Sequence, residues 1–156
     1  MERKVMTVSL IYEHSRILLA MKKRGFGEGR WNGYGGKPEE GETIEETAIR
    51  EMREESGIKI SKLEKIGIMS CHFEDNPGRV FEVHYFRVLE YSGEAEETEE
   101  MRPKWFDVVE IPYDQMWPGD KFWMHEFLGG NKFRGDTYFK DKDTLIRSDV
   151  QVVDAL

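Results

Sequence analysis

Stretches of apolar residues separated by short polar breaks mark the first part of the chain. VMTVSLIY (residues 5–12) and RILLAM (16–21) are rich in β-branched and other apolar side chains. The polar segment from Glu13 to Ser15 separates them and has the character of a tight turn, so the pair predicts a β-hairpin. Glycines recur through residues 22–41, which predicts a loop.

The pattern then changes to helical spacing. The stretch from Ile44 to Ser56 predicts an α-helix, because Thr43 and Glu46 form a capping-box pattern at its start. Gly57 follows the last turn and is suited to a C-cap. The sequence therefore defines both ends of this helix.

The rest of the chain predicts more strands and a second helix. Residues 66–73 and 80–91 are β-rich, and the second run alternates apolar and polar positions. A short helix is predicted within 113–130, closed by a pair of glycines, and closing strands are predicted at 137–141 and 144–150. Strands on both sides of one helix, with another helix near the end, predict an α/β fold with a mixed sheet between helices.

Length and composition indicate one domain. The chain has 156 residues and 38% hydrophobic content, including nine Phe and four Trp, which can fill a core. No repeat or Pro-rich linker divides it, so we expect residues 1–156 to form a single domain. Cys71 is the single cysteine, so no disulfide can form within the chain, which suits a reducing cytosol.

Charge and hydropathy argue against two classes of partner. The first apolar stretch is too short and too interrupted for a signal peptide or a membrane span. A net charge of −8 opposes binding to a nucleic-acid polymer. We therefore expect a soluble, cytoplasmic protein that binds neither membranes nor nucleic-acid polymers, and we expect it to be a monomer. A small anionic ligand remains compatible with this charge where a metal ion mediates its binding.

Three carboxylates are concentrated near the end of the predicted helix, in REMREESG (50–57). At about 100° per residue, Glu51, Glu54 and Glu55 lie on one stripe beside the apolar face. Their mutual repulsion indicates a compensating divalent cation, and hard oxygen ligands favour magnesium or manganese. The alternative is a solvated acidic face balanced by Arg50 and Arg53.

Residues upstream of this cluster favour the metal site. Gly36, Glu42 and the run from Arg50 to Ile58 fill every defined position of G-x5-E-x7-R-E-U-x-E-E-x-G-U, with Met52 accepted at the aliphatic position U. In these positions the chain resembles the Nudix hydrolase family. The resemblance implies an α/β/α sandwich with a mixed central sheet. It also implies hydrolysis of a nucleoside diphosphate linked to a further group, with Mg²⁺ as cofactor and Mn²⁺ as a substitute.

The resemblance assigns roles to the signature residues. Glu51, Glu54 and Glu55 would bind the metal, and Glu55 or a neighbouring carboxylate could instead act as the base; the sequence does not divide these duties. Arg50 would pair with these glutamates or with Glu46 and orient the cluster, a simple i,i+4 ion pair being the alternative.

Two further features belong to the implied metal site. Gly36, with Gly35 beside it, would let the backbone approach the metal or a phosphate closely, although turn formation alone would also explain both glycines. Glu100 would be an additional carboxylate near the metal, and a solvated acidic loop is the alternative. The histidines lack ligand spacing and receive no role.

Blocks outside the signature resemble one branch of the family, the MutT homologues that act on oxidised purine nucleoside triphosphates. MKKRGFG (21–27), GRWNG (29–33), EMRP (100–103) and MWP (116–118) carry the likeness. It implies 8-oxo-dGTP and related nucleotides as substrates, with the monophosphate and pyrophosphate as products. The implied base pocket consists of Asn32, Trp117 and Asp120 with walls of Thr7, Phe26 and Phe73, and Lys22 and Lys37 on the phosphate side.

Ordinary structural roles are the alternatives for these residues. Trp117 and the two phenylalanines could belong to the core, and the two lysines could be merely solvated. Asn32 and Asp120, in contrast, carry the donors and acceptors that reading a purine edge requires.

The chain departs from the branch at one polar position. Gly119 stands where a second aspartate normally precedes Asp120, so one of two adjacent acids is missing, which predicts narrower purine recognition. Cys71 and Phe81 replace an expected Phe and Met and alter the pocket's shape. The other activities considered are general nucleoside triphosphate, capped-RNA or ADP-ribose hydrolysis, and a non-hydrolytic nucleotide-binding module.

Overall fold

The computed structural model describes residues 1–156 and contains a curled β-sheet with two α-helices. The helices are α1 (Ile44–Ser56) and α2 (Asp120–Leu128), and two 3₁₀ turns, η1 (Val108–Glu110) and η2 (Tyr113–Gln115), precede α2. The strands are β1 (Glu2–Glu13), β2 (Arg16–Lys22), β3 (Trp31–Asn32), β4 (Lys59–Phe73), β5 (Arg79–Ser92), β6 (Met101–Asp107), β7 (Phe133–Asp141) and β8 (Thr144–Val152).

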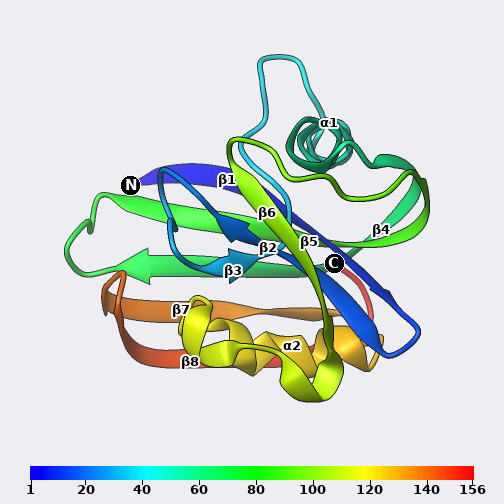
Figure 1. Cartoon of the computed structure of the whole chain (residues 1–156). Coiled ribbons are helices and arrows are strands. Elements are labelled where there is room, and N and C mark those ends of the chain that lie inside the picture. The colour runs from blue at the N-terminus through cyan, green and yellow to red at the C-terminus, as the bar shows by residue number, and fades with distance from the viewer.

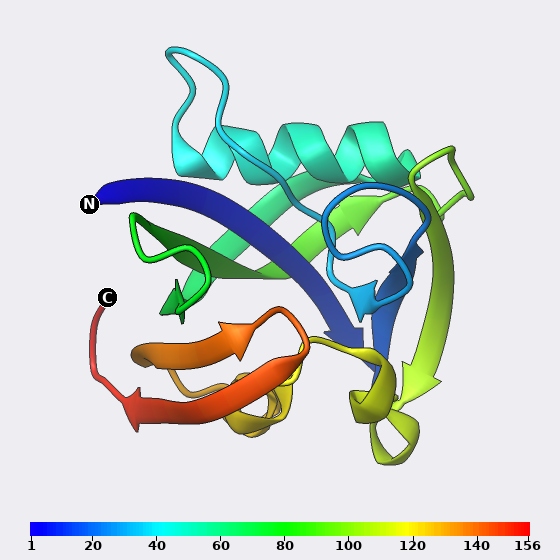
Figure 2. The same cartoon turned by 90° about the vertical axis from the view of Figure 1, so that its left-hand side faces the viewer.

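The sheet is mixed and strongly curved. Its strands run in the order β3-β2-β1-β5-β4-β7-β8, and β6 also pairs with β2. The β1–β5 and β4–β7 pairs are parallel, whereas the other pairs are antiparallel. β1 pairs with β5 from Glu2 to Leu10 and with β2 from Ile11 to Glu13, so this strand bends from one part of the sheet into the other (Figure 2).

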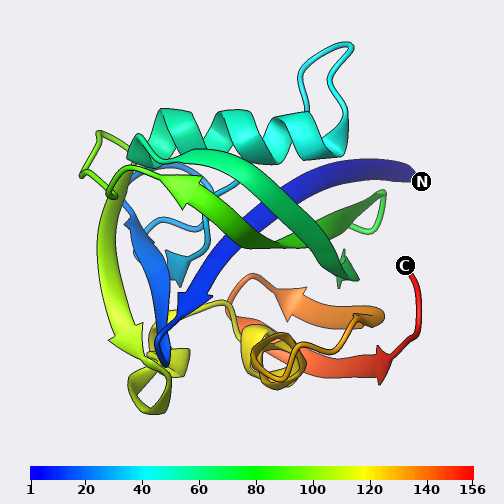
Figure 3. The same cartoon turned by 90° about the vertical axis from the view of Figure 1, so that its right-hand side faces the viewer.

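The two helices lie on opposite sides of the sheet. In Figure 1, α1 lies above the strands and packs on β1 and β4, while α2 lies at the bottom of the view, in front of β7 and β8, on which it packs. Figure 3 shows the same layering from the right-hand side, with both termini at one side of the molecule. The predicted mixed sheet between helices is confirmed. Neither helix has the length and apolar character that crossing a membrane requires.

Two apolar clusters fill the space between the layers. One lies beneath α1 and includes Met52 of that helix with Ile11 and Leu18. The other, of 16 buried residues, includes Trp123 and Phe127 of α2. Because the sheet is covered on both faces, the buried part of β2, residues 17–20, is an unbroken apolar run in the sequence.

The capping signals set the ends of α1 as predicted. The Thr43 side chain accepts a hydrogen bond from the backbone N–H of Glu46, and the Glu46 side chain accepts one from the backbone N–H of Thr43. Gly57 adopts the left-handed conformation, with φ of 83°, and its N–H donates to the carbonyl of Arg53. Ala48 and Met52 are fully buried, which fixes the face that the carboxylates border.

The strand predictions are confirmed in position but were too short. The β1–β2 hairpin closes through His14 and Ser15, which have φ of 52° and 63°. β4 begins at Lys59 rather than residue 66. The prediction missed the first half of this strand because that half is polar, and its pairing with β5 is interrupted by register shifts. β7 and β8 extend both predicted closing strands.

Two strands were missed, and one helix was placed too broadly. β3 is only two residues long and lies inside the predicted loop. β6 contains Arg102, Pro103 and Lys104, residues that disfavour a strand prediction. α2 occupies only the second half of the predicted 113–130 segment, because Pro118 precedes its start.

Candidate active site

An acidic hollow lies where α1 meets the loop after β3. Its lining consists of Lys22, Arg24, Gly35, Gly36, Glu51, Glu54, Glu55, Thr98, Glu99 and Glu100. All four carboxylates assigned to the metal by resemblance, Glu51, Glu54, Glu55 and Glu100, therefore line this one hollow. Glu55 is the most enclosed, at 5% exposure, and one of its oxygens accepts a hydrogen bond from the Gly35 N–H at 3.0 Å.

Two carboxylates in this hollow, Glu51 and Glu55, lie in surroundings that oppose their ionisation. Burial, followed by the negative charge of Glu51, raises the pKa of Glu55 to about 8, and the Gly35 N–H and Lys22 only partly oppose this. Burial also raises the pKa of Glu51, although its hydrogen bond to Arg50 acts in the opposite direction. Buried like charges of this kind are stabilised most by an added dication.

The donor set fits a hard divalent cation. It consists of carboxylate oxygens, the ligands that magnesium and manganese prefer. In this conformation no three acidic, histidine or cysteine side chains converge closely enough to enclose an ion. The side chains that would hold it are Glu51, Glu54, Glu55 and Glu100, of which Glu54 is the most exposed, at 58% of its side chain.

Arg50 organises the acidic cluster. Its guanidinium donates two hydrogen bonds to Glu42, at 2.7 and 3.0 Å, and further bonds to Glu51 at 2.8 Å and Glu54 at 3.1 Å. The hydrogen bonds from Arg50, followed by one from the Glu39 N–H and one from the Thr47 hydroxyl, lower the pKa of Glu42 to about 2. The predicted pairing with the metal-site glutamates is present, but the alternative partner Glu46 is not used, because it closes the helix cap.

The two glycines pack closely against Glu51 and Thr7. Neither Gly35 nor Gly36 has a positive φ. A Cβ atom on Gly36 would lie 2.6 Å from the Glu51 carboxyl carbon, and one on Gly35 would lie 1.7 Å from the Thr7 carbonyl oxygen. The Gly36 carbonyl itself accepts a hydrogen bond from the Thr7 N–H at 2.9 Å, which holds this loop against β1.

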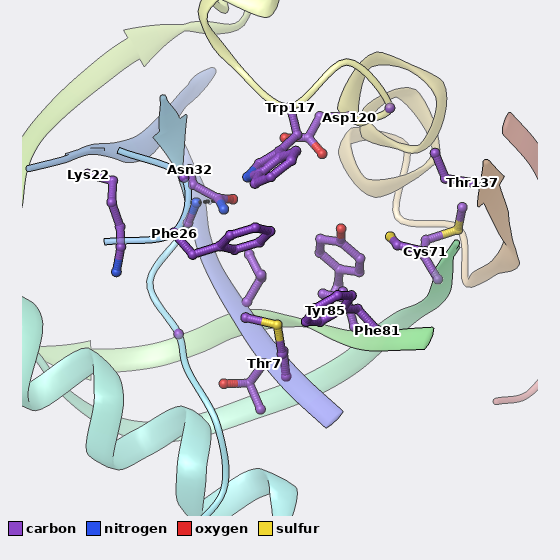
Figure 4. Close-up of a pocket in the computed structure, with 18 of the residues that line it drawn as sticks. Thr7, Lys22, Phe26, Asn32, Cys71, Phe81, Tyr85, Trp117, Asp120 and Thr137 are labelled. Atoms are coloured by element: carbon purple, nitrogen blue, oxygen red, sulfur yellow. Dashed lines mark hydrogen bonds between the residues drawn. The ribbon is translucent and has the colours of Figure 1, made fainter. Parts of the chain in front are cut away.

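A deep, mainly apolar pocket adjoins the acidic hollow. Lys22, Gly35 and Glu55 line both spaces, so the two are continuous. Figure 4 shows the Phe26 ring beneath the Trp117 ring, with Asp120 beside them. The pocket brings together six residues of the predicted base site, namely Thr7, Phe26, Asn32, Phe73, Trp117 and Asp120.

Aromatic rings form one wall and the mouth of this pocket. The Phe26 ring centroid lies 5.0 Å from that of Trp117 and 5.8 Å from that of Phe81, and its side chain is 55% exposed at the opening. Phe73 contacts Phe81 edge to face and stacks on Phe139 at 4.8 Å. A flat ligand would thus meet π-faces on entry.

Two polar side chains are positioned within the apolar lining. The Asn32 carbonyl oxygen accepts the Gly33 N–H at 2.8 Å, which orients the carboxamide. Asp120 is 5% exposed, and its Oδ1 accepts the Trp123 indole N–H at 3.3 Å, whereas its Oδ2 has no hydrogen-bond partner. Burial raises the pKa of Asp120 to about 7. An unpaired, enclosed carboxyl oxygen is suited to a polar ligand edge.

Comparison with known proteins places this arrangement in a family. Residues 1–127 match the NUDIX domain model. The chain belongs to the Nudix family. It is 45% identical over 149 residues to an oxidized purine nucleoside triphosphate hydrolase of Mus musculus, covering 96% of this chain and 95% of the relative. A protein of the same name from Danio rerio is 43% identical over 153 residues, covering 98% and 97%.

Solved structures agree with the Nudix assignment. The MutT protein of Bacillus halodurans superposes with a TM-score of 0.84 at 28% identity, covering 95% of this chain and 97% of the other. The resemblance first seen in the signature around Glu51, Glu54 and Glu55 is thereby confirmed, together with the Nudix fold.

The site residues assigned by resemblance do not all converge in this Nudix domain. Lys37 is exposed and lines neither space; only its backbone carbonyl takes part, accepting from Arg50 at 3.1 Å. Lys22 lies at the junction of both spaces, and its ammonium group is 3.7 Å from Glu100. The Lys22 side chain thus lies beside the carboxylates, whereas the Lys37 side chain does not.

Several lining residues were not singled out from the sequence. Tyr85, Trp123, Thr137 and Phe139 all face the base pocket. The strand alternation in residues 137–141 puts Thr137 and Phe139 on one face of β7. This alternation was the only feature of the sequence that could have indicated these two residues. The pairing of β7 with β4 and its packing against α2 depend on contacts between distant segments, which the pattern does not specify.

Proposed function

We propose that this protein is a divalent-metal-dependent Nudix hydrolase that converts oxidised purine nucleoside triphosphates, such as 8-oxo-dGTP, to the monophosphate and pyrophosphate. Two relatives that match nearly the whole chain carry the name oxidized purine nucleoside triphosphate hydrolase. The observation that carries the proposal is Asp120, whose buried, unpaired oxygen lies in an aromatic pocket joined to an acidic hollow.

The base would occupy the aromatic pocket. Trp117 and Phe26 offer faces for stacking, while Asn32 and Asp120 offer hydrogen bonds to its edge. A base whose donors and acceptors do not match leaves a buried group unpaired, at about 1–3 kcal/mol per group. That penalty allows oxidised guanine to be preferred over guanine by tens-fold or more.

The triphosphate would extend past Lys22 toward the carboxylates. Glu51, Glu54 and Glu55 would hold the metal, with Glu100 nearby, and Mg²⁺ or Mn²⁺ would neutralise phosphate charge and acidify a water. A carboxylate of this set accepts the proton of the attacking water. Arg50 keeps Glu51 and Glu54 in place through the hydrogen bonds described above.

The decisive experiment is steady-state hydrolysis of a nucleotide panel. It should contain 8-oxo-dGTP, dGTP and 2-hydroxy-dATP, with ADP-ribose and capped RNA as competing substrates, each assayed with Mg²⁺, with Mn²⁺ and without metal. We expect metal-dependent turnover in which 8-oxo-dGTP has the highest kcat/KM. Equal kcat/KM for 8-oxo-dGTP and dGTP would contradict a role in removing oxidised nucleotides from the nucleotide pool. Tight binding without turnover would identify a nucleotide-binding module.

Product analysis tests the position of cleavage. Attack between the α and β phosphates leaves the monophosphate and pyrophosphate, whereas first release of orthophosphate and a diphosphate would contradict the proposal. We further propose that the protein acts as a cytoplasmic monomer on free nucleotides, which light scattering and cell fractionation would check.

A further inference from the structure

An ion pair joins two distant segments at the edge of the base pocket. Arg30, in the loop between β2 and β3, donates to the Asp143 carboxylate at 2.7 Å. Asp143 lies in the β7–β8 turn, where its own N–H donates to Asp141 Oδ1 at 2.9 Å and so fixes the turn. The Arg30 side chain is only 17% exposed, whereas that of Asp143 is 68% exposed.

The same guanidinium stacks on the pocket's tryptophan. The Arg30 Cζ lies 4.2 Å from the centroid of the Trp117 ring, the distance of a close cation–π contact. Arg30 therefore covers one face of Trp117, and the Phe26 ring also contacts this tryptophan, with its centroid 5.0 Å away. The backbone of the same loop also approaches this ring, because a Cβ atom on Gly27 would lie 3.5 Å from the indole nitrogen.

Arg30 is also close enough to influence the polar end of the pocket. Burial raises the pKa of Asp120, and the positive charge of Arg30 acts in the opposite direction. No other cationic side chain contributes to the shift of this group. Arg30 thus contacts Trp117 directly and acts on Asp120 through its charge, although it does not itself line the pocket.

We propose that Arg30, held by Asp143, is a positioning residue that fixes Trp117 as the stacking wall for the purine and joins the two edges of the pocket. This inference rests on the proposed function, because it assigns a purine to that wall. The ring is then preorganised, so the base does not have to order it on binding.

The test compares KM with kcat in the full-length protein. With 8-oxo-dGTP, we expect Arg30→Met to raise KM about fivefold or more while kcat changes by less than about twofold. The variant loses the contact that positions Trp117 for stacking, and that stacking contributes equally to the bound substrate and to the transition state. Asp143→Asn removes only the exposed partner and should raise KM about twofold, an effect that high salt reproduces in the natural protein. Arg30→Lys should restore part of the lost affinity.

A matched control separates this role from general stability. Arg16 lies 5.4 Å over Trp105, outside both the pocket and the acidic hollow, so Arg16→Met removes a similar contact elsewhere. We expect its KM to equal that of the natural protein. An unchanged KM in Arg30→Met, or an equal rise in Arg16→Met, would overturn the inference.

A binding measurement distinguishes failure of this inference from failure of the proposed function. Calorimetric titration with 8-oxo-dGMP should show about fivefold weaker binding to Arg30→Met than to the natural protein, with an Arg30→Met/Asp143→Asn double variant no weaker. Absent turnover of 8-oxo-dGTP by the natural protein would refute the proposed function alone. Equal 8-oxo-dGMP affinity in the natural protein and Arg30→Met would refute the positioning role alone.

Discussion

Asp120 and Trp123, three residues apart at the start of α2, form a hydrogen bond that satisfies only half of a buried carboxyl group. The Trp123 indole N–H donates to Oδ1 at 3.3 Å, and Oδ2 remains without a partner. With a pKa of about 7, this carboxyl populates both its protonated and ionised forms near neutral pH. It can therefore donate to a base acceptor or accept from a base N–H.

The raised pKa of Asp120 makes folding stability depend on pH. Its folded pKa of about 7 exceeds the ordinary value of 3.8, so between these values the folded state binds more protons than the unfolded state. Its contribution to the free energy of unfolding must then fall as pH rises through this window. Asp120→Asn removes this pH-dependent contribution. The free energy of unfolding of the variant, minus that of the natural protein, should therefore rise by at least about 1 kcal/mol between pH 4 and 7.

Urea denaturation at a series of pH values measures this difference. The control is Asp107→Asn, because Asp107 is an exposed residue at the end of β6. A difference between Asp120→Asn and the natural protein that stays constant from pH 4 to 7 would show that Asp120 ionises normally.

Gly119 offers a test of how the protein selects the base of its substrate. A Cβ atom at this position would lie 2.9 Å from Cγ2 of Thr137, which is 3% exposed, so an aspartate there needs the methyl group to move. Thr137→Ser removes that methyl and keeps the hydroxyl that pairs with Ser148 at 3.0 Å. We expect Gly119→Asp/Thr137→Ser to raise kcat/KM for 2-hydroxy-dATP relative to 8-oxo-dGTP by about fivefold or more over Thr137→Ser alone.

The measurement is competitive hydrolysis of the two nucleotides by four proteins: natural, each single variant and the double variant. Gly119→Asp alone should also lower the melting temperature, because of the crowding against Thr137. If the adenine preference stays unchanged in the double variant, the missing second acid is not what narrows purine recognition.

The parts of the site that depend on local sequence were predictable. The helical repeat placed Glu51, Glu54 and Glu55 together, and the capping box fixed where that helix begins. Local reasoning gave the contacts of Arg50 with Glu51 and Glu54, but not its two hydrogen bonds to Glu42, which immediately precedes the N-cap of the helix.

The base pocket could not be derived in the same way. Thr7, Asn32 and Asp120 lie on three separate elements that meet only through the curvature of the sheet, and they were assigned through resemblance. Thr137 was missed because its neighbour Gly119 is distant in the sequence. Arg30 was missed because its partner Asp143 belongs to a turn without a recognisable pattern.

Glu55 is the clearest test of the catalytic assignment. Glu55→Gln keeps the side chain's shape and removes its charge, so we expect kcat for 8-oxo-dGTP to fall on the order of 100-fold or more. Glu45→Gln is the matched control, because Glu45 lies in the first turn of α1 and outside the hollow. Near-normal turnover by Glu55→Gln with Mg²⁺ present would reject a role for Glu55 as ligand or base.

The same variant should become more stable in the absence of metal. Glu55 is buried beside Glu51, and the ionised pair opposes folding when no cation is bound. With EDTA at pH 9, above the Glu55 pKa of about 8, Glu55→Gln should therefore melt several degrees higher than the natural protein. Adding Mg²⁺ should raise the melting temperature of the natural protein by mass action and that of the variant much less.

Calorimetric scans of the natural protein and Glu55→Gln, each with EDTA and with Mg²⁺, give the four melting temperatures needed, and Glu45→Gln is the control. Equal shifts on adding Mg²⁺ would mean that the cation binds elsewhere, and a lower melting temperature for the variant in EDTA would mean that the Gly35 hydrogen bond outweighs the repulsion.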